Sequence, residues 1–225
     1  KEFLQPWKLR SVVKQFSDFI EHPIVMDAEA KGEDGSAATA EETLNSRKAL
    51  WLRSKADVTT EEHHAFYRQI SGDFDDPAKV IHYAAEGTLA FKVLLYIPKR
   101  RSFELQFGEG KAGPRLYINR VQIMDACEQL LPAYLRFVKG VVDCPDLPLN
   151  VSRELLQHNP LLERIQRSVV KNVFQALGDL RDSDRSAYEG FFRELGGILK
   201  EGLGRDPGNR EALRHQATLL SETRE

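Results

Sequence analysis

The stretch Thr88-Leu-Ala-Phe-Lys-Val-Leu-Leu-Tyr-Ile97 decides the fold of this chain. Its apolar side chains at 89, 91, 93, 95 and 97 recur at every second position, which is typical of a half-buried β-strand. A second apolar run covers residues 80–86, and Glu86-Gly87 stands between the two runs. A glycine-containing turn between two such runs predicts a β-hairpin over 80–97.

Toward the C-terminus, the pattern continues as sheet before it changes to helix. Residues 116–124 are expected to form one further strand, in which the apolar phase shifts near Asn119 and indicates a bulge or burial on both faces. A short helix is expected at 129–137 and a short strand at 138–142. The chain is therefore expected to build a mixed layer of sheet and helix up to about Pro148.

Beyond Pro148 the apolar spacing is helical only. Asn159-Pro160 is a helix start signal, and an apolar stripe follows it to Phe174. A second stripe covers 188–199, and a third helix is expected near 209–220. The C-terminal part therefore predicts a helical coil packed beside the layered part.

Toward the N-terminus, residues 4–20 predict an amphipathic helix. Residues 27–46 are rich in Ala, Glu, Gly, Asp, Ser and Thr, have little to bury, and indicate a linker or a loosely held hairpin. Thr59 and Glu62 have the spacing of a capping box, which opens a helix that runs to about Ser71.

The composition excludes several classes of protein. The chain has 225 residues, 41% of them hydrophobic, which suits one or two domains. Since 32 Lys+Arg nearly balance 34 Asp+Glu, no net field favours nucleic acid or an anionic membrane. No apolar stretch approaches the length of a membrane span. Two separated cysteines and no secretory segment favour the reducing cytoplasm, and the chain, which opens without Met, is expected to be a piece of a longer protein.

Several familiar site motifs are missing or lack their context. Gly108, Gly110 and Gly113 match the G-x-G-x-x-G spacing, but Pro114 and an expected strand follow instead of a helix, so a flexible connection is the better interpretation. The six scattered histidines predict no metal site, and neither cysteine has the context of a nucleophile. The basic run 99–101 is interpreted as a solvated turn without function.

The run Asp146-Leu-Pro-Leu-Asn-Val-Ser-Arg-Glu-Leu-Leu-Gln157 is different. Asn150 and Ser152 are candidate helix caps, and Arg153 would stand in the first turn, where free backbone amides and a guanidinium converge. Gln157, four residues on, would share the face of Arg153 and add an amide donor. This geometry suits a phosphate, whereas the ordinary alternative is that Arg153 forms a surface ion pair.

The chain resembles the heat-shock protein 90 chaperones, in particular their bacterial HtpG type. The resemblance covers nearly the whole chain, and its most specific part is 147–157, which contains Asn150, Arg153 and Gln157. Other matching stretches are Ser17-Asp-Phe-Ile-Glu-His-Pro-Ile24, Leu50-Trp-Leu-Arg-Ser-Lys-Ala-Asp-Val-Thr59, Leu94-Leu-Tyr-Ile-Pro98 and Phe137-Val-Lys-Gly-Val-Val-Asp143.

The resemblance implies an α+β fold with four parts. Residues 1–27 would be the closing helix and strand of an N-terminal nucleotide domain, and 28–46 a linker. Residues 47–148 would be an α-β-α layered sandwich, similar to the second domain of ribosomal protein S5. Residues 149–225 would be the three-helix coil of the same middle domain.

The resemblance also implies a function divided between domains. The family's arginine at the position of Arg153 reaches the γ-phosphate of ATP held by the N-terminal domain, the residue at Gln157 assists it, and Asn150 would support the loop. ATP with magnesium would be bound only by the full-length protein, so no activity and no bound cofactor are expected for this chain alone. Expected partners are unfolded client proteins, the chain's own N-terminal domain, and a second copy through a C-terminal dimerisation domain, with no nucleic acid and no membrane.

One position departs from the family pattern, and two rival functions stay open. Gln122 stands where the family usually has phenylalanine, which makes a possible docking surface for the nucleotide domain more polar. The rivals are a stand-alone S5-like RNA-binding domain, which the balanced charge opposes, and a self-sufficient phosphotransfer enzyme.

Overall fold

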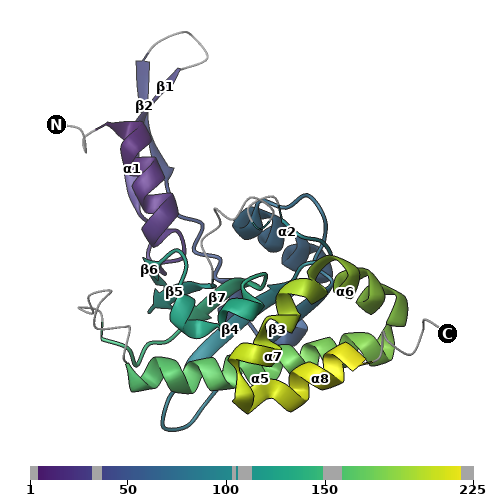
Figure 1. The fold of residues 1–225 in the computed structure, drawn as a ribbon. Helices are drawn as coiled ribbons and strands as arrows, with labels where there is room; N and C mark the ends of the chain where they lie inside the picture. The colour runs from purple at the N-terminus through teal and green to yellow at the C-terminus, as the bar shows by residue number, and fades with distance from the viewer. Residues whose placement is uncertain (1–4, 32–36, 103–104, 106–112, 149–158, 219–225) are drawn as a thin grey trace.

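A five-stranded mixed sheet forms the centre of the chain (Figure 1). The computed structural model describes residues 5–31, 37–102, 105, 113–148 and 159–218. The strands follow the order β3-β4-β7-β5-β6, and every neighbouring pair is antiparallel except β5 and β7. Their bounds are β3 (Lys79–Ala85), β4 (Phe91–Ile97), β5 (Arg115–Ile118), β6 (Val121–Met124) and β7 (Lys139–Asp143).

Helices cover both faces of this sheet, as Figure 1 shows. Val93 and Leu95 face the core shared with α5 (Pro160–Ser183) and α6 (Arg185–Lys200), while Leu94 and Tyr96 face the core shared with α2 (Thr60–Ser71). Residues 93–97 are therefore fully buried at 0% exposure. The predicted hairpin is confirmed, but the prediction that β4 is half-buried is wrong, because this strand is central and covered on both sides.

The prediction of one strand over 116–124 is also wrong, because a turn divides the segment. Asn119 (φ 50°) and Arg120 (φ 68°) both adopt the left-handed conformation, which makes a two-residue connection between β5 and β6. Asparagine tolerates this conformation better than most residues, and two successive positive φ angles match the twist of a tight hairpin. The shift in apolar phase near Asn119 marks this turn.

The segment 129–137 forms two short 3-10 turns instead of the predicted helix. They are η5 (Glu128–Leu130) and η6 (Ala133–Leu135). Pro132 stands between them in an extended conformation and has no N–H to continue a helical ladder. The predicted strand that follows is confirmed as β7.

The start of α2 confirms the predicted capping box. The backbone N–H of Glu62 donates to Thr59 Oγ1 at 3.2 Å, and the backbone N–H of Thr59 donates to Glu62 Oε2 at 2.9 Å. The helix ends at Ser71, where Gly72 takes the left-handed conformation. Two 3-10 turns precede it, η3 (Leu50–Leu52) and η4 (Lys55–Asp57).

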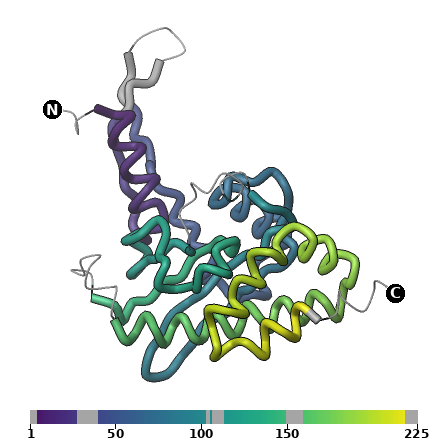
Figure 2. The backbone as a smooth tube through the Cα atoms, in the orientation of Figure 1, coloured from purple at the N-terminus to yellow at the C-terminus, as the bar shows by residue number. Residues whose placement is uncertain are grey.

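The N-terminal part projects from the body of the molecule, as Figures 1 and 2 show. The predicted helix is α1 (Pro6–Val12), continued by the π-helical turn η2 (Val13–Ser17). Strands β1 (Val25–Lys31) and β2 (Ala37–Thr43) pair antiparallel, so the hairpin forms rather than a plain linker. The Asn45 side chain closes the base by donating to the carbonyls of Ile20 and His22.

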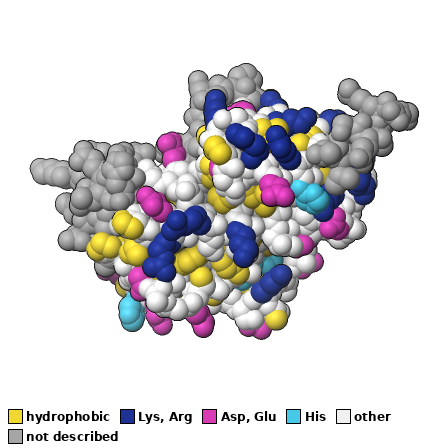
Figure 3. Space-filling view, turned by 60° about the horizontal axis from the view of Figure 1, so that its bottom comes forward, with side chains coloured by type: hydrophobic (Ala, Val, Ile, Leu, Met, Phe, Trp, Pro, Cys, Tyr) yellow, Lys and Arg dark blue, Asp and Glu magenta, His cyan; other side chains and the backbone are white. Residues whose placement is uncertain are grey.

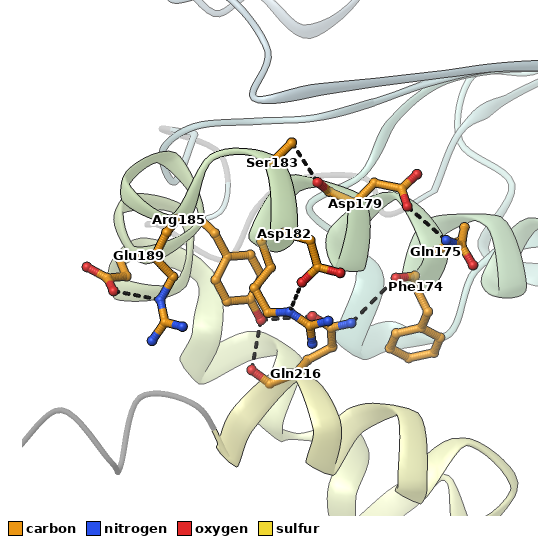
Figure 4. Close-up of polar contacts among 10 residues, drawn as sticks. Phe174, Gln175, Asp179, Asp182, Ser183, Arg185, Glu189 and Gln216 are labelled. Atoms are coloured by element: carbon orange, nitrogen blue, oxygen red, sulfur yellow. Dashed lines mark hydrogen bonds and ion pairs between the residues drawn. The ribbon is translucent and has the colours of Figure 1, made fainter.

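The C-terminal helices confirm the predicted coil. Asn159 caps α5 with its side chain, and α6 and α8 (Arg210–Thr218) follow, joined by the short helix α7 (Gly202–Arg205) and the 3-10 turn η7 (Pro207–Asn209). Gln216 of α8 donates to the Phe174 carbonyl of α5, a contact drawn in Figure 4. Gln216 also accepts from the Tyr188 hydroxyl of α6 at 2.8 Å, so one buried amide joins three helices.

Candidate functional site

The three residues that the sequence singled out, Asn150, Arg153 and Gln157, lie outside the described residues, as does Ser152. They belong to the segment 149–158, whose two flanks the structure does describe. The candidate site is therefore built from those flanks and from the end of the sheet beside them.

The upstream flank leaves β7 and is fixed at once to the neighbouring strands. The backbone N–H of Cys144 donates to the Tyr117 carbonyl at 3.1 Å. Asp146 Oδ2 accepts from the backbone N–H of Ala90 at 2.8 Å, and Leu147 is buried at 2% exposure. The chain thus enters the segment 149–158 from a fixed position at the end of the sheet.

The downstream flank is fixed to the same turn. Asn159 accepts from the backbone N–H of Leu161 at 2.9 Å, and Pro160 opens α5. One turn further on, Arg164 Nη2 donates to Thr88 Oγ1 at 2.8 Å. Since Asp146 and Arg164 contact residues only two apart in the β3–β4 connection, the two described flanks of the segment 149–158 are held beside that connection.

A buried carboxylate organises the end of the sheet. Asp143, the last residue of β7, is 3% exposed. Its Oδ2 accepts from Trp51 Nε1 at 2.9 Å and from the backbone N–H of Arg120 at 3.2 Å. Asp143 therefore joins η3, the β5–β6 turn and the start of the upstream flank, and it holds the left-handed turn in place.

Burial and hydrogen bonding have opposite effects on the pKa of the Asp143 carboxyl. Desolvation raises its pKa, while the hydrogen bonds from Trp51 and Arg120 act in the opposite direction. Its second oxygen, Oδ1, accepts no hydrogen bond within the described part of the chain. Trp51 in turn packs on Phe19, with ring centroids 4.7 Å apart, and Arg120 reaches Glu21 at 3.6 Å. The site thus extends to the base of the projecting N-terminal part.

A pocket of about 450 Å³ opens at this end of the sheet. Lys92 and Asp143 are cross-strand neighbours in it, and Glu86, Asn119 and Arg120 complete its polar side. Its described lining contains no Ser, Thr, Cys or His, so it offers no hydroxyl, thiol or imidazole group. The remaining lining residues are Leu52, Ala84, Ala85, Ala90, Phe91 and Pro145.

Gln122 makes a buried polar contact. Gln122 is 5% exposed, and its Oε1 accepts from the Tyr117 hydroxyl at 2.9 Å. Burial raises the pKa of the Tyr117 hydroxyl to about 12, so this hydroxyl keeps its proton and donates it. The buried amide oxygen of Gln122 therefore has a hydrogen-bond donor within the same hairpin.

Other candidate groups have structural roles. Burial raises the pKa of the Cys144 thiol, which therefore stays protonated. His63 points into the core, 3.2 Å from the Tyr96 hydroxyl, whereas His64 contacts Asp76 at 3.1 Å, so the adjacent pair does not converge. Within the described residues no cluster of His, Cys, Asp and Glu is arranged to hold a metal. No helix in that part of the chain is long and apolar enough to cross a membrane.

Comparisons with known proteins identify the family. The model of the family described as Hsp90 protein matches residues 27–221. Chaperone protein HtpG of Geobacter sulfurreducens is 49% identical over 99% of this chain and 36% of that protein. The HtpG proteins of Nocardia farcinica and Mycobacterium leprae are 46% and 44% identical over 98% of the chain and 35% of their length. The chain spans about a third of these relatives, and it belongs to the heat-shock protein 90 family as a segment of the bacterial HtpG type.

Proposed function

We propose that this chain is the segment of an ATP-dependent HtpG chaperone that supplies Arg153 to the γ-phosphate of ATP bound by the N-terminal domain. Gln157 would assist as a neutral donor, and Asn150 would hold the loop in shape. A planar guanidinium suits this task because it stabilises the charge that spreads over the transferring phosphoryl oxygens. The ATP, its magnesium and the water-activating carboxylate would be held outside this chain.

The anchoring of the two described flanks of the segment 149–158 supports this proposal most directly. Asp146 and Arg164 attach the two flanks to Ala90 and Thr88, just before β4, whose residues 93–97 are fully buried. Electrostatic catalysis requires donors on a fixed support, and the described flanks provide such a support on both sides of the segment that contains Arg153. We also propose that the layered part has the fold of the second domain of ribosomal protein S5. The proposed division of the chain has four parts, 1–27, 28–46, 47–148 and 149–225.

The whole protein would act on unfolded client proteins in the cytoplasm, with this chain forming part of the client-contacting surface. It would dimerise through a domain that follows residue 225. The rival function, RNA binding by a stand-alone domain, lacks support: the formal net charge is only −2, and on the face shown in Figure 3 basic side chains are interspersed with acidic and apolar ones.

The decisive experiment is the substitution Arg153→Ala in the full-length protein. ATP turnover should fall on the order of a hundredfold or more, because one charge-stabilising donor is lost. The dissociation constant for ATP should stay within about twofold of the wild-type value, since the nucleotide pocket is held elsewhere. Steady-state hydrolysis and equilibrium binding of a fluorescent ATP analogue measure the two quantities.

Two further variants complete the design. Arg153→Lys keeps the charge but loses the planar fork, so turnover should recover only in part. Arg167→Ala removes an exposed arginine from α5 and should leave turnover unchanged. Equal turnover in Arg153→Ala and Arg167→Ala would contradict the proposed role.

A further inference from the structure

A second surface of the chain, distinct from the flanks of the segment 149–158, carries several cationic side chains. These side chains form no strong ion pair within the described part of the chain. The turn after β4 and the outer side of α6 enclose a groove of about 380 Å³. Its polar rim consists of Lys99 and Arg100 on the turn and of Arg193 and Glu194 on the helix. We call this surface the basic groove.

The basic groove has a fixed shape. Arg101 Nη2 donates to the Glu194 carbonyl at 3.0 Å, which ties the turn to α6. Phe191 backs the floor from inside, is 1% exposed, and packs edge-on against Phe137 at 5.5 Å between ring centroids. The helix wall therefore rests on the main core, and the Arg101 side chain joins the turn to it.

The floor of the basic groove is open because its residues are small. Ala187 and Gly190 lie one helical turn apart on α6 and line the groove. A Cβ built on Gly190 would meet no atom within 4 Å. Glycine is the poorest helix former after proline, and packing against the chain does not require it here. A glycine at this position leaves space for an external group to approach the helix.

The charges on the rim are mostly unpaired. Among the described residues, neither Lys99 nor Arg193 has an ion-pair partner. Arg100 contacts Asp75 only at 3.5 Å, and the two side chains are 75% and 55% exposed, so water screens that contact strongly. By contrast, Arg136, which follows η6, forms hydrogen bonds of 2.8 Å with both carboxylate oxygens of Glu201. Three cations thus face the groove against one carboxylate.

We propose that the basic groove is a docking site for a short acidic segment of a partner polypeptide. Guanidinium and ammonium groups on both rims match carboxylates, while the shallow floor over Ala187 and Gly190 accepts one small apolar side chain between them. The volume fits a few side chains rather than an extended polyanion. The near-neutral charge of the chain also disfavours a nucleic-acid duplex.

Binding of a fluorescein-labelled Glu-Glu-Ala-Glu-Glu peptide to the full-length protein tests the proposal. Fluorescence anisotropy at physiological ionic strength should detect binding of this peptide and none of the isosteric Gln-Gln-Ala-Gln-Gln peptide. Lys99→Glu and Arg193→Glu should each weaken binding roughly tenfold, because each exchanges an attraction for a repulsion. Lys171→Glu, an exposed residue of α5 outside the groove, is the matched control and should change the affinity by less than about twofold.

Gly190→Leu tests whether peptide binding depends on the shape of the groove and not only on the charge of the surface. It fills the floor with a better helix former, so it should abolish peptide binding without lowering the melting temperature. Unchanged binding in Gly190→Leu would overturn the proposal, and so would equal affinity for the glutamine peptide. Equal loss in Lys171→Glu, or competition by inorganic phosphate or an RNA oligomer at the same concentration as the peptide, would show a general anion effect and overturn it as well.

Discussion

His63 and His82 meet on the face of the sheet that α2 covers, and they make the stability of the fold depend on pH. Their ring centroids lie 5.6 Å apart, and both side chains are under 9% exposed. Burial lowers the pKa of each imidazole, and the charge of His82 lowers that of His63 further. Both residues are therefore neutral in the folded chain at pH values where the unfolded chain already binds protons.

The free energy of unfolding should consequently be constant above about pH 6.5, the unfolded value for histidine, and should fall as the pH drops below it. Urea unfolding between pH 5.5 and 8 measures this, in a range where most carboxylates do not titrate. His82→Gln should reduce the slope below pH 6.5, whereas His22→Gln, at an exposed position, should not. Identical slopes in the two variants would refute the assignment.

At the same scale, Asp143 shows why part of the candidate site could not be predicted. Its partner Trp51 is 92 positions away, and no local pattern connects a strand-terminal aspartate to a tryptophan in a 3-10 turn. The sequence placed both residues only within stretches that resemble the family. The signal that could have been used is chemical: a carboxylate that directly follows a buried apolar strand needs donors from elsewhere in the fold.

At the scale of elements, one hydroxyl of α6 contacts Gln216 of α8, the residue that also reaches α5. Tyr188 is fully buried and donates to the carbonyl and to the side-chain oxygen of Gln216 at 2.7 and 2.8 Å. Tyr188→Phe keeps the ring but leaves two buried acceptors without this donor. The free energy of unfolding should fall by about 1–3 kcal/mol, as measured by urea titration.

Tyr83→Phe provides the comparison for that variant. The Tyr83 hydroxyl contacts Ser168 Oγ at 3.2 Å, and this contact is half-buried. Its loss should lower the free energy of unfolding by less than about 1 kcal/mol. A cost for Tyr83→Phe as large as that for Tyr188→Phe would mean that the hydroxyl of Tyr188 does not hold the three helices together.

Elements were predictable where a periodic pattern and an end signal agreed. Asn159-Pro160 and the capping box at Thr59 gave the starts of α5 and α2 correctly, because these signals act within three residues. The predictions were wrong where packing against distant parts of the chain, or a proline, determines the local structure. The β4 strand alternates like a surface strand, yet packing on two sides buries it, and Pro132 divides a segment whose apolar spacing is helical.

At the scale of the whole molecule, the two proposed sites differ in whether the sequence could indicate them. The proposed role of Arg153 came only from the resemblance, since physical reasoning by itself favoured a surface ion pair. The basic groove was not accessible from sequence, because the run 99–101 looked like an ordinary solvated turn. Lys99 and Arg193 are 94 positions apart in the sequence, and only the folded chain places both on the rim of the same groove.

The projecting N-terminal part and the central sheet should open independently. The hairpin β1–β2 has two strands and joins the body at its base, through contacts such as the Ser46 backbone N–H to Asp18 Oδ1 at 2.8 Å. A two-stranded hairpin is only marginally stable by itself. The β4 strand, by contrast, lies between β3 and β7 and is buried on both faces.

Native-state hydrogen exchange followed by mass spectrometry should therefore show two levels of protection in this chain. Amides of β4 and β7 should exchange only through global unfolding, with a strong dependence on urea, because their opening exposes the whole core. Amides of β1 and β2 should exchange at least about a hundredfold faster and with little dependence on urea, since a local opening exposes little surface. Equal protection of both regions would show instead that the hairpin unfolds only together with the sheet. The contacts at Asp18 and Asn45 would then have to couple the two parts into one cooperative unit.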